Sequence, residues 1–338
     1  MKKKSLLILL IILLIIVGYF FVGFPKPKEG IIWGVSFSQK HAKNLGLDWQ
    51  ETYLALFDDL GAKNLKIAAH WDLIESEEGK YNFEDLDWQI QKAEEKGAKL
   101  LLVLGMKVPR WPECHLPEWA KIQNSKFLPT GDLPKGDKNQ KLLEYIKEIV
   151  NRYKDSPVIW AWQVENEPFF PFGECPEFDK DLFEKEIALV KSLDSKRPVI
   201  ISESGEFFLW FRAAKYGDIV GVTMYRKVWF GELKNYINYP FPAIFYQRRA
   251  KLINRIFGKE VICVELQAEP WGPKLLYDLP LEEQEKTMNL EQFRKNIEFA
   301  KKTGLKEFYL WGAEWWYWLK EKQNQPEIWQ EARKLFAK

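Results

Sequence analysis

The sequence predicts an α/β protein, a single (β/α)8 TIM barrel preceded by one N-terminal transmembrane helix. Short apolar segments typical of β-strands alternate with amphipathic helical segments from residue 31 to the C-terminus, and this alternation predicts parallel βαβ units. A long uncharged apolar run precedes them. A doubly wound open sheet is the alternative, but it normally has a glycine-rich phosphate loop after its first strand, where this chain has only Gly34.

The N-terminal segment predicts a membrane anchor. Lys2, Lys3 and Lys4 precede an uncharged apolar run at residues 6–24, and about 20 such residues span a bilayer as a helix. No small-residue cleavage site stands before Pro25. We therefore expect residues 1–28 to form a cytoplasmic tip, an anchor that contacts the lipid bilayer through residues 6–24, and a short linker. Residues 29–338 would be extracytoplasmic, or secreted if the segment is a long signal peptide that is cleaved.

The barrel strands are predicted from short apolar runs. We expect eight of them, at residues 31–36, 64–70, 99–104, 158–164, 198–202, 219–224, 261–265 and 307–311. Helices are expected at residues 49–60, 83–96, 139–153, 182–193, 211–216, 246–256, 290–302 and 327–336. Gly61, Gly97 and Gly304 each stand between a helical pattern and the next strand, where glycine commonly ends a helix. Eight βα units in residues 29–338 fit one barrel with long loops.

The composition excludes several classes of protein. With 46% hydrophobic and 29% charged residues, the chain is neither disordered, nor fibrous, nor a multi-pass membrane protein. The formal net charge of +2 gives no basic face for nucleic acid, so no nucleic-acid partner is expected. The 3 cysteines form no CxxC pair and there are only 3 histidines, so we expect no metal site and no cofactor. The aromatic content of 15% is high, and aromatic rings stack on the apolar faces of sugars.

Carboxylates follow two strands on opposite sides of the predicted barrel. The fourth strand ends in Glu165-Asn166-Glu167-Pro168, and the seventh ends in Glu265. Catalytic residues of such barrels lie at the C-terminal ends of the strands. Enzymes that hydrolyse glycosides with retention use two carboxyl groups about 5–5.5 Å apart. Glu269 lies a turn beyond Glu265, and it stays open as a rival nucleophile.

These segments resemble the clan A glycoside hydrolases, similar to family 5-like cellulases and endo-β-glycanases. Trp162 and the Asn166-Glu167-Pro168 tripeptide resemble the Asn-Glu-Pro signature of these enzymes, and residues 71–87 resemble their second βα unit. The resemblance covers residue 31 to about residue 318. It implies that Glu167 is the acid/base and Glu265 the nucleophile. It also implies that Tyr225 hydrogen-bonds the nucleophile.

The resemblance also implies a set of substrate contacts. Asn166 would hold the sugar 2-hydroxyl, and the alternative is a turn residue before proline. The clan usually has an arginine on the second strand, where this chain offers Lys66 and His70, so His70 is expected to take over part of that role unless it is a core histidine. The aromatic and histidine candidates for sugar binding, for each of which packing is the alternative, are Trp71, Trp111, His115, Trp271, Trp311 and Trp315.

A disulfide is expected between Cys114 and Cys175. These residues follow the third and fourth strands, which are neighbours in a barrel, so their loops lie at the same end. The outside of a membrane permits disulfides. Proximity without a bond is the alternative.

The function expected from these features is hydrolysis of β-glycosidic bonds in a polysaccharide or oligosaccharide by double displacement. The partner would be a β-linked glycan. Three alternatives are a carbohydrate-binding barrel whose catalysis has lapsed, a transglycosylase, and a metal-dependent barrel enzyme. The identity of the glycan and the choice between endo and exo action stay open.

Overall fold

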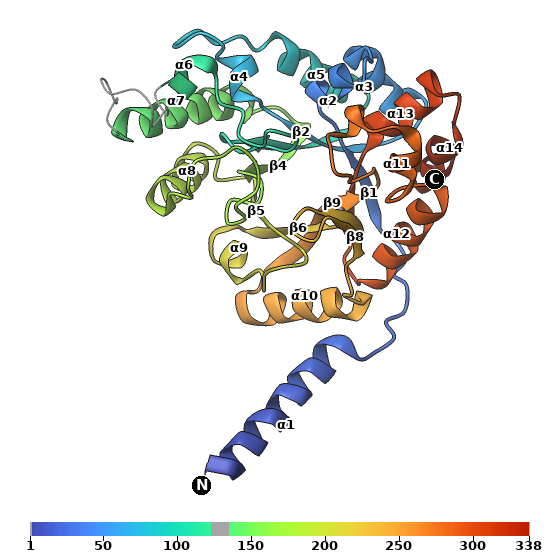
Figure 1. Ribbon diagram of the computed structural model, residues 1–338. Coiled ribbons are helices and arrows are strands. Elements are labelled where there is room, and N and C mark those ends of the chain that lie inside the picture. The colour runs from blue at the N-terminus through green and yellow to red at the C-terminus, as the bar shows by residue number, and fades with distance from the viewer. Residues whose placement is uncertain (1, 123–134, 338) are drawn as a thin grey trace.

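Eight parallel strands form a closed barrel in the computed structural model, which describes residues 2–122 and 135–337 (Figure 1). Around the barrel the strands follow the order β1-β10-β9-β6-β5-β4-β3-β2. Their bounds are Ile32–Ser36 (β1), Asn64–Ala68 (β2), Lys99–Leu104 (β3), Ile159–Val164 (β4), Val199–Glu203 (β5), Ile219–Met224 (β6), Glu260–Gln267 (β9) and Glu307–Trp311 (β10). The predicted single (β/α)8 barrel is therefore confirmed, with every predicted strand in place.

The strands are apolar on both faces because the barrel is filled inside and covered outside. A compact cluster that includes Leu101, Ile200 and Tyr309 is formed by residues of different strands. Gly34 on β1 makes room for it, because a Cβ atom there would lie 2.8 Å from the ring of Tyr309. Such continuous apolar strands are typical of parallel sheets with both faces buried, which is why their positions could be predicted.

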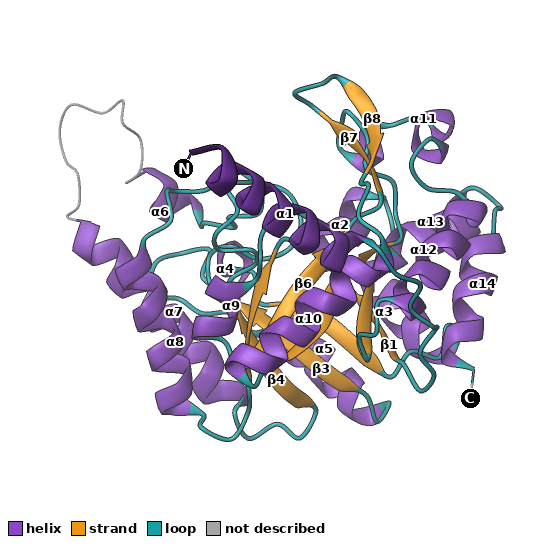
Figure 2. Ribbon diagram, turned by 90° about the horizontal axis from the view of Figure 1, so that it is seen from below, coloured by secondary structure: helices purple, strands orange, loops and turns teal. Residues whose placement is uncertain are grey.

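Helices surround the barrel (Figures 1 and 2). Their bounds are Lys2–Phe21 (α1), Gln39–Asn44 (α2), Trp49–Asp58 (α3), Trp71–Ile74 (α4), Glu84–Glu95 (α5), Glu118–Ile122 (α6), Lys135–Tyr153 (α7), Lys180–Leu193 (α8), Phe211–Tyr216 (α9), Ala243–Phe257 (α10), Leu281–Glu285 (α11), Leu290–Lys302 (α12), Ala313–Lys322 (α13) and Glu327–Phe336 (α14). A short 3₁₀ helix covers Leu276–Asp278.

The sequence did not predict the antiparallel hairpin of β7 (Lys227–Phe230) and β8 (Asn235–Asn238). It projects from one side of the molecule, beyond the end of β6 (Figure 2). The helices α2, α4, α6, α11 and α13 were also missed. Most of these elements are only four to six residues long, too short for a periodic pattern to mark them.

The predicted N-terminal transmembrane helix is wrong. Across residues 2–122 and 135–337, none of the helices combines the length and apolar character that crossing a bilayer requires. This also leaves the predicted bilayer contact of residues 6–24 without support. The first helix, α1, instead ends against α10, where the ring of Phe21 lies 5.0 Å from Phe245 and the guanidinium of Arg248 lies 4.5 Å from the Tyr19 ring (Figure 1).

Candidate active site

The carboxyl group of Glu265 is buried at the C-terminal end of the barrel. Glu265 lies on β9, and its side chain is only 4% exposed. The Nζ atom of Lys66, on β2, donates to its Oε1 at 2.9 Å, and the hydroxyl of Tyr225 donates to its Oε2 at 3.2 Å. Both oxygens of the carboxylate therefore accept a hydrogen bond, one of them from a buried cation. These two hydrogen bonds fix the position of the carboxyl group.

Glu167 follows β4 and is held by the next two strands. Its backbone N–H donates to the hydroxyl of Ser202 on β5 at 2.8 Å, and Thr223 on β6 donates to its Oε1 at 3.0 Å. Its φ of 44° is unusual for a residue with a side chain, so the surrounding contacts must fix this conformation. Burial, and then repulsion from the charges of Glu265 and Glu113, raise the pKa of Glu167 to about 8.

The two carboxyl groups therefore have opposite environments within one site. Glu265 has a buried lysine as its partner. Glu167 instead accepts from a hydroxyl group, and the negative charge of Glu265 raises its pKa. A carboxylate that is fixed by a cation, beside a carboxyl group whose pKa is raised, can serve as the nucleophile of a pair in which the second group is the proton donor.

Lys107 joins the loops that follow β3 and β4. Its Nζ donates to the carbonyl oxygens of Glu167 at 3.1 Å and Phe170 at 2.6 Å. Its backbone N–H donates to Oε2 of Glu165 at 2.6 Å, and its carbonyl accepts from the N–H of Asn166 at 2.6 Å. Gly105 permits this approach, since a Cβ atom there would lie 2.4 Å from Glu165 Oε1. One buried lysine thus holds the backbone on both sides of Glu167.

A third carboxyl group lies beside the pair. Nδ2 of Asn166 donates to Oε2 of Glu113 at 3.4 Å, and Oδ1 of Asn166 accepts from Gln163 at 3.1 Å. Burial, and then the charge of Glu265, raise the pKa of Glu113 to about 8. Asn166 is therefore fixed by two neighbours, and one of its amide hydrogens remains for another acceptor.

Glu269, the rival nucleophile, belongs to a separate buried ion cluster. It pairs with Arg110 and lies 3.5 Å from Nε2 of His41, while Arg110 also pairs with Glu314 at 3.1 Å. Burial alone would raise the pKa of Glu269, but the charges of Arg110 and His41 outweigh it and lower the pKa to about 2. The guanidinium carbon of Arg110 also lies over the ring of Trp311, 3.8 Å from the ring centre.

The two histidines predicted to bind substrate are buried and neutral. His115 accepts from Lys40 through Nδ1 at 2.9 Å and donates from Nε2 to the carbonyl of Arg110 at 3.0 Å. Burial, and then the charge of Lys40, lower the pKa of His115 to about 3. His70 packs edge-on against His115, 4.7 Å away, and burial lowers its pKa well below the usual range.

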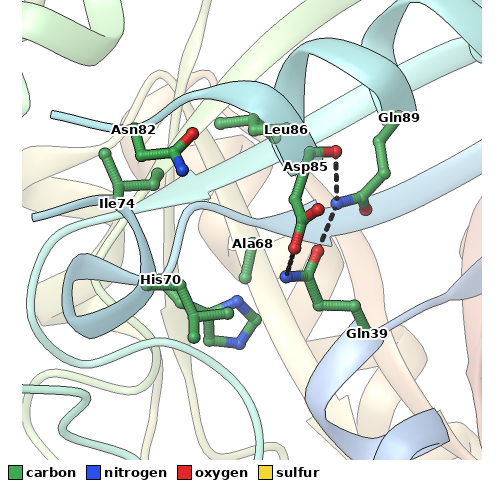
Figure 3. Close-up of a pocket in the computed structure, with 9 residues that line it drawn as sticks. Gln39, Ala68, His70, Ile74, Asn82, Asp85, Leu86 and Gln89 are labelled. Atoms are coloured by element: carbon green, nitrogen blue, oxygen red, sulfur yellow. Dashed lines mark hydrogen bonds between the residues drawn. The ribbon is translucent and has the colours of Figure 1, made fainter. Parts of the chain in front are cut away.

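The structure does not bring His70 into contact with Glu265. Its side chain lies at a small cavity between α2, α4 and α5, together with Gln39, Asp85 and Gln89 (Figure 3). Gln89 donates to Gln39 at 2.7 Å, and Gln39 donates to Asp85 at 2.9 Å. Lys66 alone therefore contacts the carboxylate from β2, the strand where the clan usually has an arginine.

The predicted tryptophans divide into buried and rim positions. Trp71 and Trp315 are each 2% exposed, and their indole N–H groups donate to Glu75 and Gln284. Trp311, at the end of β10, is 5% exposed beneath Arg110. Trp111 is 43% exposed and Trp271 is half-buried, and both follow barrel strands. The structure thus places only the last two at an accessible rim.

A disulfide joins Cys114 to Cys175, while Cys263 is a buried free thiol. The bond connects the loop that contains Glu113 to the loop that follows Glu167. Within the described ranges, no group of three or more histidine, cysteine, aspartate or glutamate side chains is arranged to hold a metal ion.

Sequence reasoning missed several residues of the site. Lys107, Arg110 and Glu113 lie in the irregular loop after β3. Only their charge, close to the end of a strand, could have identified them as candidate site residues. Ser202 lies one residue before the end of β5 and Thr223 one residue before the end of β6, so the rule used to find Glu265 could have found them.

Comparisons with known proteins point to glycoside hydrolases. A family model described as β-galactosidase matches residues 47–177. A probable mannan endo-1,4-β-mannosidase A-1 of Aspergillus terreus is 30% identical over 125 residues, which are 36% of this chain and 30% of that protein. The matched part therefore spans less than a third of this relative.

Solved structures of glycoside hydrolases share the barrel. An endo-1,4-β-D-mannanase of Thermotoga petrophila RKU-1 has a TM-score of 0.55 and 19% identity, over 83% of this chain and 88% of its own. A β-galactosidase of Rahnella sp. R3 has a TM-score of 0.59 and 11% identity, over 93% of this chain and 57% of that protein's chain. At these identities the structures show the fold alone. Together with the sequence matches, they confirm the predicted resemblance to TIM-barrel glycoside hydrolases.

Proposed function

We propose that this chain is a retaining glycoside hydrolase that acts on β-linked glycans. The observation that carries the proposal is the pair formed by Glu167 and Glu265. Glu265 is bound by Lys66 and Tyr225, and Glu167 has a pKa raised to about 8. The first group would be the nucleophile, and the raised pKa of the second keeps it protonated at neutral pH, as double displacement requires.

The proposed reaction has two steps. In the first, a carboxylate oxygen of Glu265 attacks the anomeric carbon, the glycosidic bond breaks, and Glu167 gives its proton to the leaving oxygen. In the second, Glu167 removes a proton from water, which attacks the same carbon and releases Glu265. Asn166, with a free amide hydrogen, would donate to the sugar 2-hydroxyl. No net proton is consumed, and the anomeric configuration is retained.

The proposed substrate is a polysaccharide or oligosaccharide with β-linkages. The matches to a mannan-degrading relative and to a β-galactosidase family favour this class. A transglycosylase would use the same two residues and replace water by a sugar hydroxyl in the second step. A binding barrel with lapsed catalysis would retain the glycan but release no product.

The test uses the full chain with β-mannan, β-glucan, β-xylan and β-galactan, and measures new reducing ends. Glu167→Gln and Glu265→Gln should each lower the rate by about 100-fold or more, since each removes one proton donor or nucleophile. Glu177→Gln is the matched control, because Glu177 is an exposed carboxylate on the loop after β4. Release that persists in Glu167→Gln would contradict the assignment of the acid/base. Binding to a glycan without release would favour the lapsed barrel.

A further inference from the structure

One segment of the chain contacts both of the residues that bind the proposed catalytic pair from the end of β6. Thr223, on β6, donates to Glu167. Tyr225, directly after β6, donates to Glu265. The segment at residues 204–208 follows β5, and we call it the β5 loop. It binds Thr223 through its backbone and Tyr225 through a side chain.

The backbone of the β5 loop binds the hydroxyl of Thr223. The N–H of Gly205 donates to Oγ1 of Thr223 at 3.2 Å, and the same hydroxyl donates to Oε1 of Glu167 at 3.0 Å. A hydroxyl has one proton, and Gly205 offers it a donor, so this proton is directed at Glu167. The loop lies so close to β6 that a Cβ atom on Gly205 would overlap the carbonyl oxygen of Thr223.

The side chain of Glu206 binds the backbone of Tyr225. Glu206 is only 5% exposed, and its Oε1 accepts from the N–H of Tyr225 at 2.9 Å. The same oxygen accepts from the hydroxyl of Tyr246, on α10, at 2.9 Å, and Ser204 donates to Oε2 at 3.5 Å. The hydroxyl of Tyr225 in turn donates to Glu265 at 3.2 Å. A single residue therefore connects Glu206 to the proposed nucleophile.

A buried arginine holds the backbone of the β5 loop. Arg249, on α10, is 1% exposed and donates to the carbonyl oxygens of Gly205 and Phe208. Its guanidinium carbon lies 3.7 Å from the ring centre of Trp210. A planar guanidinium that binds two carbonyl groups and packs on an aromatic ring leaves the loop little freedom to move. The β5 loop is thus a fixed support for the end of β6.

We propose that Glu206 is a positioning residue for the proposed reaction. It fixes the backbone of Tyr225 so that the tyrosine hydroxyl stays against Glu265. The loop that contains it directs the hydroxyl of Thr223 at Glu167, so one support serves both carboxyl groups. Small displacements of reacting groups cost much of the rate, which is why such a support matters. The inference rests on the proposed function for the roles of Glu167 and Glu265.

The kinetic test is a double-variant cycle on the full chain, with a β-glycan that it cleaves. Glu206→Leu removes the acceptor of the Tyr225 N–H, so kcat should fall by about tenfold or more while KM changes less. Tyr225→Phe removes the bond to Glu265 itself. If Glu206 acts through Tyr225, Glu206→Leu should lower kcat by only about threefold or less when Tyr225→Phe is already present. An equal loss in both backgrounds would overturn the inference.

Two further variants separate positioning from a general structural role. Glu206→Gln keeps an acceptor oxygen for Tyr225 and should keep kcat within about threefold of the parent. A loss as large as that of Glu206→Leu would overturn the inference. Glu203→Leu is the matched control, because Glu203 is 2% exposed and its side chain binds Ala213 and Arg212. Any loss of kcat in this control should be the same with and without Tyr225→Phe.

A crystal structure of the Glu206→Leu variant tests the inference without any activity. A Tyr225 hydroxyl that has left hydrogen-bond distance of Glu265 supports the inference, and an unmoved hydroxyl overturns it. If the parent cleaves no glycan, the proposed function fails, and this structure still decides the inference. If Glu206→Leu does not fold, Glu206→Asp replaces it in both experiments, because it keeps the charge but withdraws the acceptor by one CH2 group.

Discussion

At the level of single residues, the charges around Glu167 predict the pH dependence of the enzyme. As the proposed proton donor, Glu167 must be protonated to assist the leaving oxygen, and burial together with Glu265 and Glu113 raises its pKa to about 8. Activity should therefore be retained through neutral pH and fall as the pH rises past about 8. A profile of kcat/KM against pH measures this alkaline limb.

Replacing Glu113 should move the alkaline limb to lower pH. Its charge is one of the causes that raise the pKa of Glu167, so Glu113→Gln removes repulsion and makes Glu167 easier to ionise. The shift should be a fraction of a pH unit to about one unit. An alkaline limb in Glu113→Gln that is unchanged or moved upward would show that Glu113 does not act on Glu167.

Replacing Lys107 should have the opposite effect. Its cation lowers the pKa of Glu167 against the larger effect of burial, so Lys107→Met should move the alkaline limb to higher pH. The same variant loses the hydrogen bonds to the carbonyls of Glu167 and Phe170, so kcat should fall by about tenfold or more. General unfolding cannot move the limb in opposite directions in the two variants. Shifts of equal sign would therefore refute this electrostatic account.

The pair of Lys66 and Glu265 predicts a large effect on stability. Both side chains are at most 4% exposed, so Lys66→Met leaves an uncompensated buried carboxylate, a change that typically costs about 3–5 kcal/mol. Urea denaturation should show this loss, together with a strong decrease in kcat. The double variant Lys66→Met/Glu265→Leu should recover much of the stability without activity. Unchanged stability of the single variant would mean that the pair is not buried as described.

At the level of elements, the loops after β3 and β4 are joined twice, by Lys107 and by the disulfide. The bond between Cys114 and Cys175 closes a sequence separation of 61 residues. A loop of this size corresponds to about 4 kcal/mol in the chain-entropy model. Cys114→Ser should therefore lower the free energy of unfolding by roughly this amount, as measured with guanidinium. Dithiothreitol should destabilise the parent but not the variant, and equal effects on both would contradict the bond.

The strands could be predicted from the sequence, whereas the loop residues could not. Apolar runs such as Leu100–Leu104 are required by burial on both faces of a parallel strand, and carboxylates such as Glu265 stand directly at their ends. Arg110 and Glu113 lie in a loop with positive φ at both positions, 89° and 73°. No periodic pattern describes such a backbone, so the partners of these side chains depend on tertiary packing.

At the level of the whole molecule, the barrel brings distant segments to one end. Lys66, Glu167, Tyr225 and Glu265 follow or lie on four different strands, and closure of the sheet places them in one hydrogen-bonded and electrostatic network.

The N-terminal helix was predicted wrongly because only its length and apolar character were used. An apolar run of about 20 residues satisfies the length rule for a membrane span, but the rule does not consider packing such as that of α1 against α10.

The most direct test of the central claim is the anomeric configuration of the first product. The chain should be incubated with a β-glycan or β-glycoside that it cleaves, and proton NMR should follow the new reducing end before mutarotation. If Glu265 attacks the sugar and Glu167 then activates water, the β-anomer appears first and the α-anomer grows later. Initial appearance of the α-anomer would mean a single inverting displacement and would contradict the assignment of Glu265 as the nucleophile.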